Sequence, residues 1–224
     1  MKTEIVCILD RSGSMGSMKD EAIGGFNGFL DDQKAIPDPA NLTLAIFDYE
    51  YKVLYDAKDI ADIPPLTDLL YHPRGSTALL DAIGMGVSNT KERIAKYQQT
   101  IIDAGGTKPD APKVVVMILT DGQENSSKEW DKGRVAKLIE ECKKENWQFL
   151  FLSADMNGIA DAQHYGLGAN DIIGFKNSKL AASKAFSYGG MNVGKYRTSG
   201  SMASSNNKSF LGDTDAEDID KTTP

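Results

Sequence analysis

Short runs of aliphatic residues alternate along this chain with segments whose apolar residues recur at helical spacing. The first aliphatic run, Ile5 to Leu9, is followed by a Gly- and Ser-rich stretch and then by a helical pattern over residues 22–30. The run from Val114 to Leu119 likewise precedes a helical pattern over residues 135–142. This alternation is typical of a mainly parallel sheet with helices on both faces. It therefore predicts an α/β fold.

The remaining patterns complete a six-stranded, doubly wound sheet of the Rossmann-like kind. We expect the strand order 3-2-1-4-5-6, with one antiparallel edge strand. Residues 42–46 and 51–55 alternate between apolar and polar and predict a hairpin at a sheet edge. The other predicted elements are a long helix from Thr77, strands at 149–152 and 172–175, and helices at 159–164 and 178–188.

The length of 224 residues suits one large domain with a substantial core. We expect that domain to cover residues 1–190. Beyond Gly189 the composition shifts to Gly, Ser and Asn, and acidic residues gather between positions 213 and 220. Such a segment contains too few apolar residues to offset the entropy of ordering it. We therefore expect residues 191–224 to form a flexible, acidic tail.

Charge and cysteine content exclude several classes of protein. A net charge of −7 argues against a general nucleic-acid binder, which needs a basic surface. The aliphatic run from Ile5 to Leu9 is too short for a signal-peptide core or a membrane span. The two cysteines, Cys7 and Cys142, are typical of small buried apolar residues in a reducing compartment. We expect a cytoplasmic protein that binds neither nucleic acid nor membranes.

Five oxygen-bearing side chains in three segments indicate a metal site. Both aspartates directly follow an aliphatic run, so each is expected where a buried strand ends. With the strand order above, those two strands flank the point where the order reverses, and ligands bind there in open parallel sheets. Hydroxyl and carboxylate oxygens without His or Cys suit Mg²⁺, or Mn²⁺ or Ca²⁺, rather than zinc. The predicted ligands are Asp10, Ser12, Ser14, Thr77 and Asp121.

The order of these residues resembles the von Willebrand factor type A domain. That family carries a metal-ion-dependent adhesion site (MIDAS) with the pattern D-x-S-x-S, then a distant Thr, then a distant Asp that Gly usually follows. Here the three parts are Asp10 to Ser14, Thr77, and Asp121 with Gly122. The resemblance covers roughly residues 3–176. It includes the two aliphatic runs that precede the aspartates, which are predicted to be strands. The segments DRSGSM and LTDGQEN are most similar to the bacterial and phage branch of the family.

The resemblance implies a function as well as a fold. In the family, the protein does not close the Mg²⁺ site, and an acidic residue of a partner protein completes the metal shell. The resemblance thus implies a metal-dependent protein-binding module that engages a carboxylate of an unidentified protein partner. It implies no enzymatic activity and no catalytic residue.

Other interpretations remain open at this point. Each part of the motif, taken alone, is also what a turn or a helix N-cap would use. A phosphotransferase resembling the haloacid dehalogenase superfamily would likewise place Asp after the first strand, but its acid–base residue would fall at Ser12, which cannot protonate a leaving group. A structural subunit of a phage or stress-response complex is the third alternative. The neighbouring Asp48, Asp155, Glu124 and Asn125 are expected to be ordinary solvated loop residues.

Overall fold

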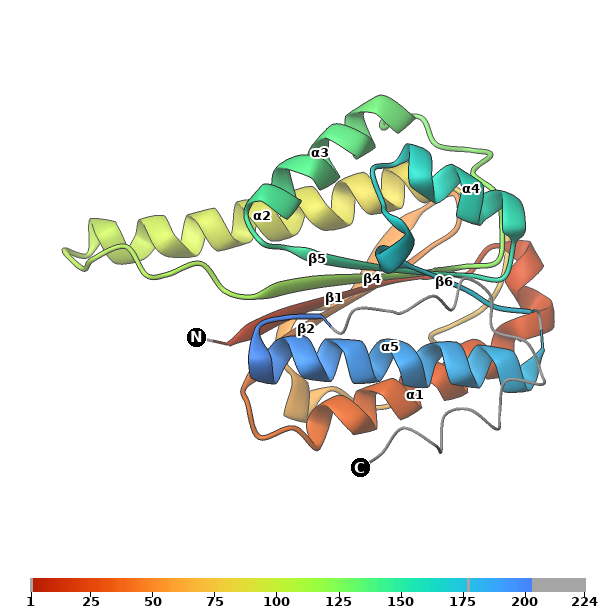
Figure 1. Ribbon diagram of the computed structural model, residues 1–224, viewed down its shortest axis with the longest axis horizontal. Coiled ribbons are helices and arrows are strands. Elements are labelled where there is room, and N and C mark those ends of the chain that lie inside the picture. The colour runs from red at the N-terminus through yellow and green to blue at the C-terminus, as the bar shows by residue number, and fades with distance from the viewer. Residues whose placement is uncertain (1, 177, 203–224) are drawn as a thin grey trace.

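The computed structural model describes residues 2–176 and 178–202, and these form a six-stranded sheet between two layers of helices (Figure 1). The strand order is β3-β2-β1-β4-β5-β6, and every neighbouring pair is parallel except β2 and β3. The predicted doubly wound fold, strand order and antiparallel edge strand are confirmed. The strands are β1 (Thr3–Asp10), β2 (Ala40–Phe47), β3 (Tyr51–Asp59), β4 (Val114–Thr120), β5 (Gln148–Ser153) and β6 (Ile172–Gly174).

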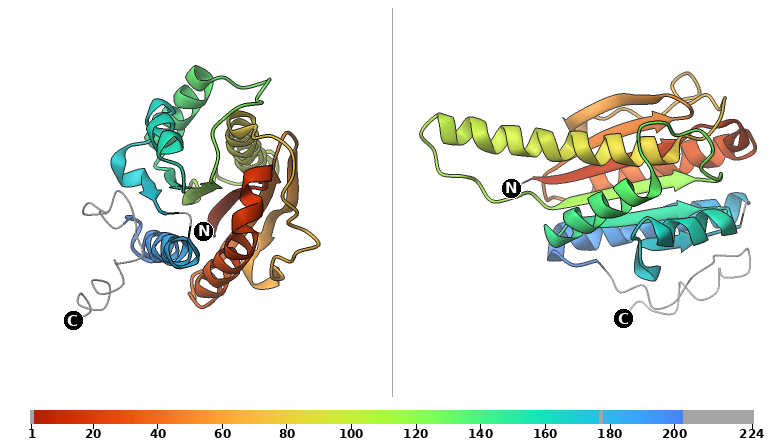
Figure 2. Two further views of the ribbon diagram at one scale, coloured as in Figure 1. Left: turned by 90° about the vertical axis from the view of Figure 1, so that its right-hand side faces the viewer. Right: turned by 90° about the horizontal axis from the view of Figure 1, so that it is seen from above.

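The helices divide between the two faces of the sheet. In Figures 1 and 2, α2, α3 and α4 cover one face, and α1 and α5 lie side by side on the other. No helix within residues 2–176 and 178–202 combines the length and the apolar character that a membrane crossing requires. The helices are α1 (Lys19–Lys34), α2 (Leu79–Asp103), α3 (Lys132–Lys144), α4 (Met156–His164) and α5 (Lys179–Ser199), with short 3₁₀ helices at Gly13–Met18, Ile60–Asp62 and Ala169–Asp171.

The central strand β1 shows why the aliphatic runs are continuous. All of its residues are buried. Cys7 and Leu9 pack into the core beneath α1 and α5, whereas Val6 and Ile8 pack into the core beneath α2 and α3. A strand that is covered on both faces needs apolar side chains at consecutive positions, because successive side chains point to opposite faces. Burial of each such side chain contributes about 1.5–3 kcal/mol to folding.

The last helix is longer than the sequence patterns predict. The predicted end near Tyr188 is wrong, because α5 continues to Ser199 and is capped by Gly200 with φ of 76°. A side-chain carbon at Gly189 would lie 3.0 Å from Leu150 Cδ2, so this glycine lets α5 approach β5 closely. Residues 191–199 are therefore helical. The part of the predicted flexible tail that spans 203–224 lies outside the described residues.

Candidate metal centre

The ends of β1 and β4 bring the two predicted aspartates together. Asp10 is the last residue of β1, and Asp121 directly follows β4. The two strands are parallel neighbours, with Leu9 opposite Leu119. Thr120 therefore lies beside Asp10, and its hydroxyl donates a hydrogen bond of 2.6 Å to Asp10 Oδ2. The switch point of the sheet thus carries two carboxylates on adjacent strand ends.

The loop after β1 connects these carboxylates through its serines. The backbone N–H of Ser12 donates to Asp10 Oδ1 at 2.6 Å. The hydroxyl oxygens of Ser12 and Ser14 lie 3.1 Å apart. Ser14 Oγ then donates to Asp121 Oδ1 at 2.7 Å. Four of the five predicted ligands therefore form one continuous set of contacts.

Gly122 shows that Thr77 belongs to the same cluster. A side-chain carbon added at Gly122 would lie 3.3 Å from both Ser14 Oγ and Thr77 Oγ1, and 3.9 Å from Asp10 Oδ2. Oxygens from all three predicted segments thus surround one small space. The helix that follows begins at Leu79, and its N-cap residue is Ala78. Thr77 is therefore not the helix cap that it would be in an ordinary turn.

The chemistry and spacing of these oxygens fit a divalent cation that takes oxygen ligands, such as Mg²⁺. Adjacent ligands of an octahedral ion with bonds of 2.0–2.1 Å lie about 2.9 Å apart. The measured separations are 3.1 Å between the two serine hydroxyls and 2.7 Å between Ser14 and Asp121. Among the described residues, no three His, Cys, Asp or Glu side chains gather as a metal cluster. The donors are hydroxyls and two carboxylates, a set that suits a hard cation rather than zinc.

The cluster is buried on one side and open on the other. Asp10, Ser12 and Thr77 are almost completely buried. Ser14 is exposed and Asp121 is partly exposed. An ion held by these five side chains would therefore have its remaining coordination position on the side of Ser14 and Asp121, where a group from another molecule can reach it.

Both carboxylates are protonated more easily than ordinary aspartates. Burial raises the pKa of Asp10 to about 6, although hydrogen bonds from Thr120 and Ser12 oppose the rise and the charge of Asp121 adds to it. Burial also raises the pKa of Asp121, which the hydrogen bond from Ser14 lowers and the charge of Asp155 raises. Two carboxylates with raised pKa values at one place favour a cation, because its charge stabilises their ionised forms.

Two residues that support Asp10 carry no signal in the sequence patterns. Thr120 precedes the Asp-Gly pair as the last residue of β4, and its role depends on the register between β1 and β4. Tyr71 is fully buried and donates its hydroxyl hydrogen to the backbone oxygen of Asp10. It reaches the site from a loop 61 residues along the chain. Periodicity and spacing could not have identified it.

Glu124 and Asn125 hold the loop after β4 against the start of α2. Asn125 is exposed, as expected of a loop residue, and Glu124 is partly exposed, but both also form hydrogen bonds with the protein. Glu124 Oε2 accepts a hydrogen bond of 2.9 Å from the N–H of Leu80 in the first turn of α2. Asn125 Oδ1 accepts from the N–H of Thr77 at 2.9 Å, and the N–H of Asn125 donates to the carbonyl of Thr77 at 3.0 Å. The loop that carries Asp121 is thereby joined to the residue that supplies the threonine hydroxyl.

Asp81, in the first turn of α2, adds further hydrogen bonds between α2 and the loop after β4. Its carboxylate accepts hydrogen bonds of 2.8–2.9 Å from the backbone N–H groups of Lys128, Glu129 and Trp130. Its own N–H donates to Ser127 Oγ at 3.0 Å. The start of α2 and residues 121–130 therefore behave as one hydrogen-bonded unit.

The two remaining loop aspartates also have structural roles. Asp48 is completely buried, and its Oδ2 lies 3.2 Å from Arg11 Nε and 2.8 Å from Arg74 Nε. Asp155 caps α4 by accepting from the N–H of Gly158 at 2.9 Å. The expectation of a solvated loop carboxylate is wrong for Asp48, whereas Asp155 is partly exposed and also bonds to Gly158.

Replacing Glu124 by glutamine is expected to weaken the unit that holds Asp121 and Thr77 together. Loss of the charged cap should lower the free energy of unfolding by about 1–2 kcal/mol. The affinity for Mg²⁺ should fall about 10-fold, as it does when an outer-shell partner of a metal site is removed. Chemical denaturation and calorimetric titration measure the two effects. Glu129→Gln, in the same loop but with an exposed side chain, should change neither; equal behaviour of the two variants would contradict the assignment.

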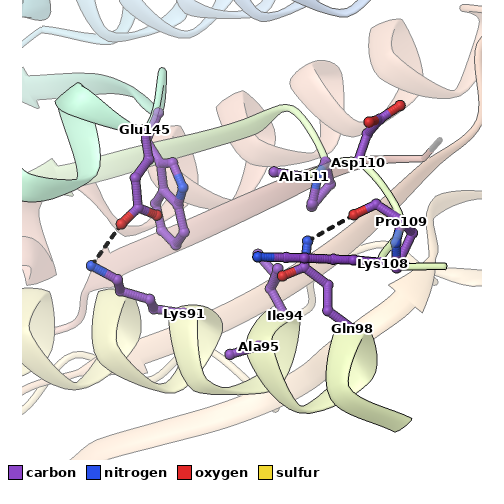
Figure 3. A pocket seen from close by; sticks show the side chains of 11 residues that line it. Lys91, Ile94, Ala95, Gln98, Lys108, Pro109, Asp110, Ala111 and Glu145 are labelled. Carbon is purple, nitrogen blue, oxygen red and sulfur yellow. Dashed lines mark hydrogen bonds and ion pairs between the residues drawn. The ribbon is translucent and has the colours of Figure 1, made fainter. Parts of the chain in front are cut away.

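A cavity lies far from this site, where the second half of α2 extends past the starts of the strands (Figures 1 and 3). Its volume is about 630 Å³, and its walls include Ile94, Pro109 and Trp147. The ion pair between Lys91 Nζ and Glu145 Oε1, 3.0 Å long, closes one end. Among the residues that line it, no group of carboxylates or hydroxyls comparable to the cluster at Asp10 is present.

Among the comparisons with known proteins, the matches are to solved structures. No protein-family model matches the sequence, and no curated protein matches it. The vWF domain of the type V pili tip protein Mfa5 from Porphyromonas gingivalis gives a TM-score of 0.58 at 12% identity, covering 86% of this chain and 95% of that chain. The von Willebrand factor type A structure from Catenulispora acidiphila gives a TM-score of 0.56 at 15% identity, covering 85% of this chain and 42% of that chain.

A third neighbour contains a metal. Proximal thread matrix protein 1 from the mussel byssus, solved with a zinc-occupied MIDAS motif, gives a TM-score of 0.53 at 17% identity, covering 83% of this chain and 44% of that chain. This chain thus spans less than half the length of the mussel and Catenulispora chains. At such low identity the likeness concerns the fold alone. The chain has the fold of von Willebrand factor type A domains.

Proposed function

We propose that this chain is a metal-dependent protein-binding module. Its Mg²⁺ site would consist of Asp10, Ser12, Ser14, Thr77 and Asp121, and the ion would engage an acidic residue of a partner protein. The observation that carries the proposal is the space beside Gly122, around which oxygens of Ser14, Thr77 and Asp10 converge from three segments. Five oxygens around an octahedral ion would leave one position for a ligand from outside.

The residues of the site have distinct tasks in this mechanism. Mg²⁺ supplies a positive charge and an open coordination position that attract a carboxylate. Asp10 is held in place through both of its oxygens by Ser12 and Thr120. Ser14 and Asp121, on the open side, would orient the incoming group relative to the ion. Recognition by the protein and metal binding therefore become one event, and removal of the metal removes both.

Further details belong to the same proposal. Mg²⁺ is the ion that we propose, and Mn²⁺ or Ca²⁺ would find the same oxygen ligands. A cytoplasmic location and a bacterial or phage origin remain predictions from the sequence. The buried free thiols of Cys7 and Cys142 agree with a reducing compartment. Nucleic acid is not proposed as a partner, since the net charge is −7.

The alternatives have less support. A phosphotransferase needs an acid–base residue near Asp10, and the side chain there is the hydroxyl of Ser12, which contacts Ser14. A structural subunit would not need oxygens from three segments around one small space. We therefore assign no catalytic residue.

Selection from a phage-displayed random peptide library tests the proposed function. The immobilised full chain would be washed in Mg²⁺ buffer and eluted with EDTA. Clones released by EDTA should contain Asp or Glu, because a carboxylate is the group that the open position accepts. The same clones should not bind Asp10→Asn. A selection that yields no EDTA-released clones would overturn the proposal, and so would clones without an acidic residue.

A further inference from the structure

Asp48 is a third aspartate at the end of a sheet strand, beside the two that we propose as metal ligands. It directly follows β2, which is the parallel neighbour of β1 on the side away from β4. Phe47, the last residue of β2, lies opposite Asp10. The side chain of Asp48 is completely buried. A buried carboxylate needs partners that offset its lost hydration, so the groups that bind Asp48 show what it holds together.

Two arginines from different segments of the site bind this carboxylate. Asp48 Oδ2 lies 2.8 Å from Arg74 Nε and 3.2 Å from Arg11 Nε. Arg74 belongs to the segment that leads to Thr77. Arg11 is the first residue of the serine loop (residues 11–18, between β1 and α1). Asp48 therefore joins the two segments that supply the proposed hydroxyl ligands.

Backbone hydrogen bonds connect the same segments. The N–H of Arg11 donates to the carbonyl of Phe47 at 2.7 Å, and the carbonyl of Arg11 accepts from the N–H of Arg74 at 2.8 Å. The carbonyl of Asp48 accepts from the N–H of Ala78 at 2.8 Å. Arg11 is thus held through its N–H, its carbonyl and its side chain. Because it stands between two of the proposed ligands in the chain, its position restricts where their side chains can lie.

The contact between Arg11 and Asp48 is one of charge rather than of hydrogen-bond geometry. Arg11 is 7% exposed, and within the residues that the structure describes its Nε makes no hydrogen bond. Arg74, by contrast, is exposed and donates a hydrogen bond of 2.8 Å to Asp48. A charge contact does not require a planar guanidinium, so a lysine ammonium at position 11 would supply the same attraction. Loss of the Arg11 charge would still leave Asp48 paired with Arg74.

We propose that Arg11, through its ion pair with Asp48, is a positioning residue of the metal site. This inference rests on the proposed metal-dependent function. Neither side chain would touch the ion. The pair holds the serine loop against the segment that leads to Thr77, so the hydroxyls of both segments face one space before an ion binds. Affinity for the metal therefore depends on the pair, whereas the affinity of the loaded site for a partner does not.

Replacing Arg11 by methionine removes the charge and keeps a long apolar side chain. The Mg²⁺ affinity of Arg11→Met in calorimetric titration should fall about 10-fold, as expected when a residue that supports a ligand is removed. Arg11→Lys, which restores the charge, should bind Mg²⁺ as the wild type does. Lys19→Met is the matched control, because Lys19 directly follows the serine loop and forms an ion pair of 2.7 Å with the exposed Asp68. It should bind Mg²⁺ normally.

Two further measurements separate positioning from stability and from partner contact. A role in stability alone would lower the free energy of unfolding, measured in urea, and leave the Mg²⁺ affinity of the folded protein unchanged. A role in partner contact would weaken peptide binding at saturating Mg²⁺. The probe is a synthetic peptide of the most frequent EDTA-released library clone, followed by fluorescence polarisation. Arg11→Met should bind it as the wild type does at saturating Mg²⁺, because the loaded ion presents the same open position.

Unchanged Mg²⁺ affinity in Arg11→Met would overturn the inference. An equal loss in Arg11→Met and Arg11→Lys would also overturn it, because the charge would then not be what holds the loop. Weaker peptide binding by Arg11→Met at saturating Mg²⁺ would place Arg11 in contact with the partner, contrary to the inference. Each of these results leaves the proposed function intact, provided that the wild type binds Mg²⁺ and Asp10→Asn does not. A wild type without Mg²⁺ affinity would overturn the proposed function and this inference together.

Discussion

Asp10→Asn is expected to abolish Mg²⁺ binding and yet to make the metal-free protein more stable at neutral pH. The carboxylate is completely buried, and burial raises its pKa from 3.8 to about 6. The folded protein therefore favours the neutral form of this group. A rise of this size corresponds to about 3 kcal/mol of folding free energy.

The sign of the pH dependence follows from this rise. In the metal-free protein, the stability associated with Asp10 is fully present below pH 3.8 and is lost as the pH increases through about 6. Asparagine carries no charge at any pH, so the variant should not show this loss. Mg²⁺ should stabilise the wild type above pH 6, because it binds the ionised carboxylate. It should leave Asp10→Asn unaffected.

Denaturation in urea at several pH values, with and without Mg²⁺, measures both effects. Calorimetric titration should show that the variant binds Mg²⁺ at least about 100-fold more weakly than the wild type. This loss is larger than the usual effect of removing a residue that supports a ligand without touching the metal. Asp48→Asn is the informative control, since Asp48 is equally buried but is paired with Arg11 and Arg74. Removing the charge of Asp48 should lower the free energy of unfolding by about 3 kcal/mol or more, because it leaves buried arginine charge without its partner. Retention of Mg²⁺ affinity by Asp10→Asn would contradict the site.

Gly122→Ala is expected to weaken metal binding without unfolding the protein. The added methyl carbon would lie 3.3 Å from both Ser14 Oγ and Thr77 Oγ1, in the space around which the ligands converge. The hydroxyls would have to move by a few tenths of an ångström, and an octahedral Mg²⁺ tolerates little change in ligand position. We expect Mg²⁺ affinity to fall between about 10-fold and 100-fold.

Gly16→Ala supplies the matched control for this substitution. Gly16 lies in the 3₁₀ helix of the serine loop, and a side-chain carbon there would meet no atom within 4 Å. Its Mg²⁺ affinity should equal that of the wild type in calorimetric titration. If both alanine variants bind Mg²⁺ normally, the ion does not occupy the space beside Gly122.

The sequence predicts this fold well because its strands are buried on both faces. Neighbouring residues such as Val6 and Cys7 pack into the cores on opposite faces of the sheet. A continuous aliphatic run therefore indicates a strand that is buried on both faces. The strand order then predicts that Asp10 and Asp121 are neighbours. The contacts that support them, from Tyr71 and Glu124, depend on loops whose paths no local pattern determines. The sequence does not predict the length of α5, because Gly189 and Gly190 are typical of a helix end, whereas here Gly189 permits close packing against β5.

The hydrogen bonds between the start of α2 and the loop after β4 affect how the site assembles around an ion. Thr77 and Asp121 come from distant parts of the chain, yet Asn125 and Glu124 join their segments in advance. An arriving ion therefore meets segments that are already joined rather than three independent loops, and the entropy lost on chelation is correspondingly smaller. The serine loop is joined to the same unit, because the N–H of Gly13 donates to the carbonyl of Gly75 at 3.0 Å.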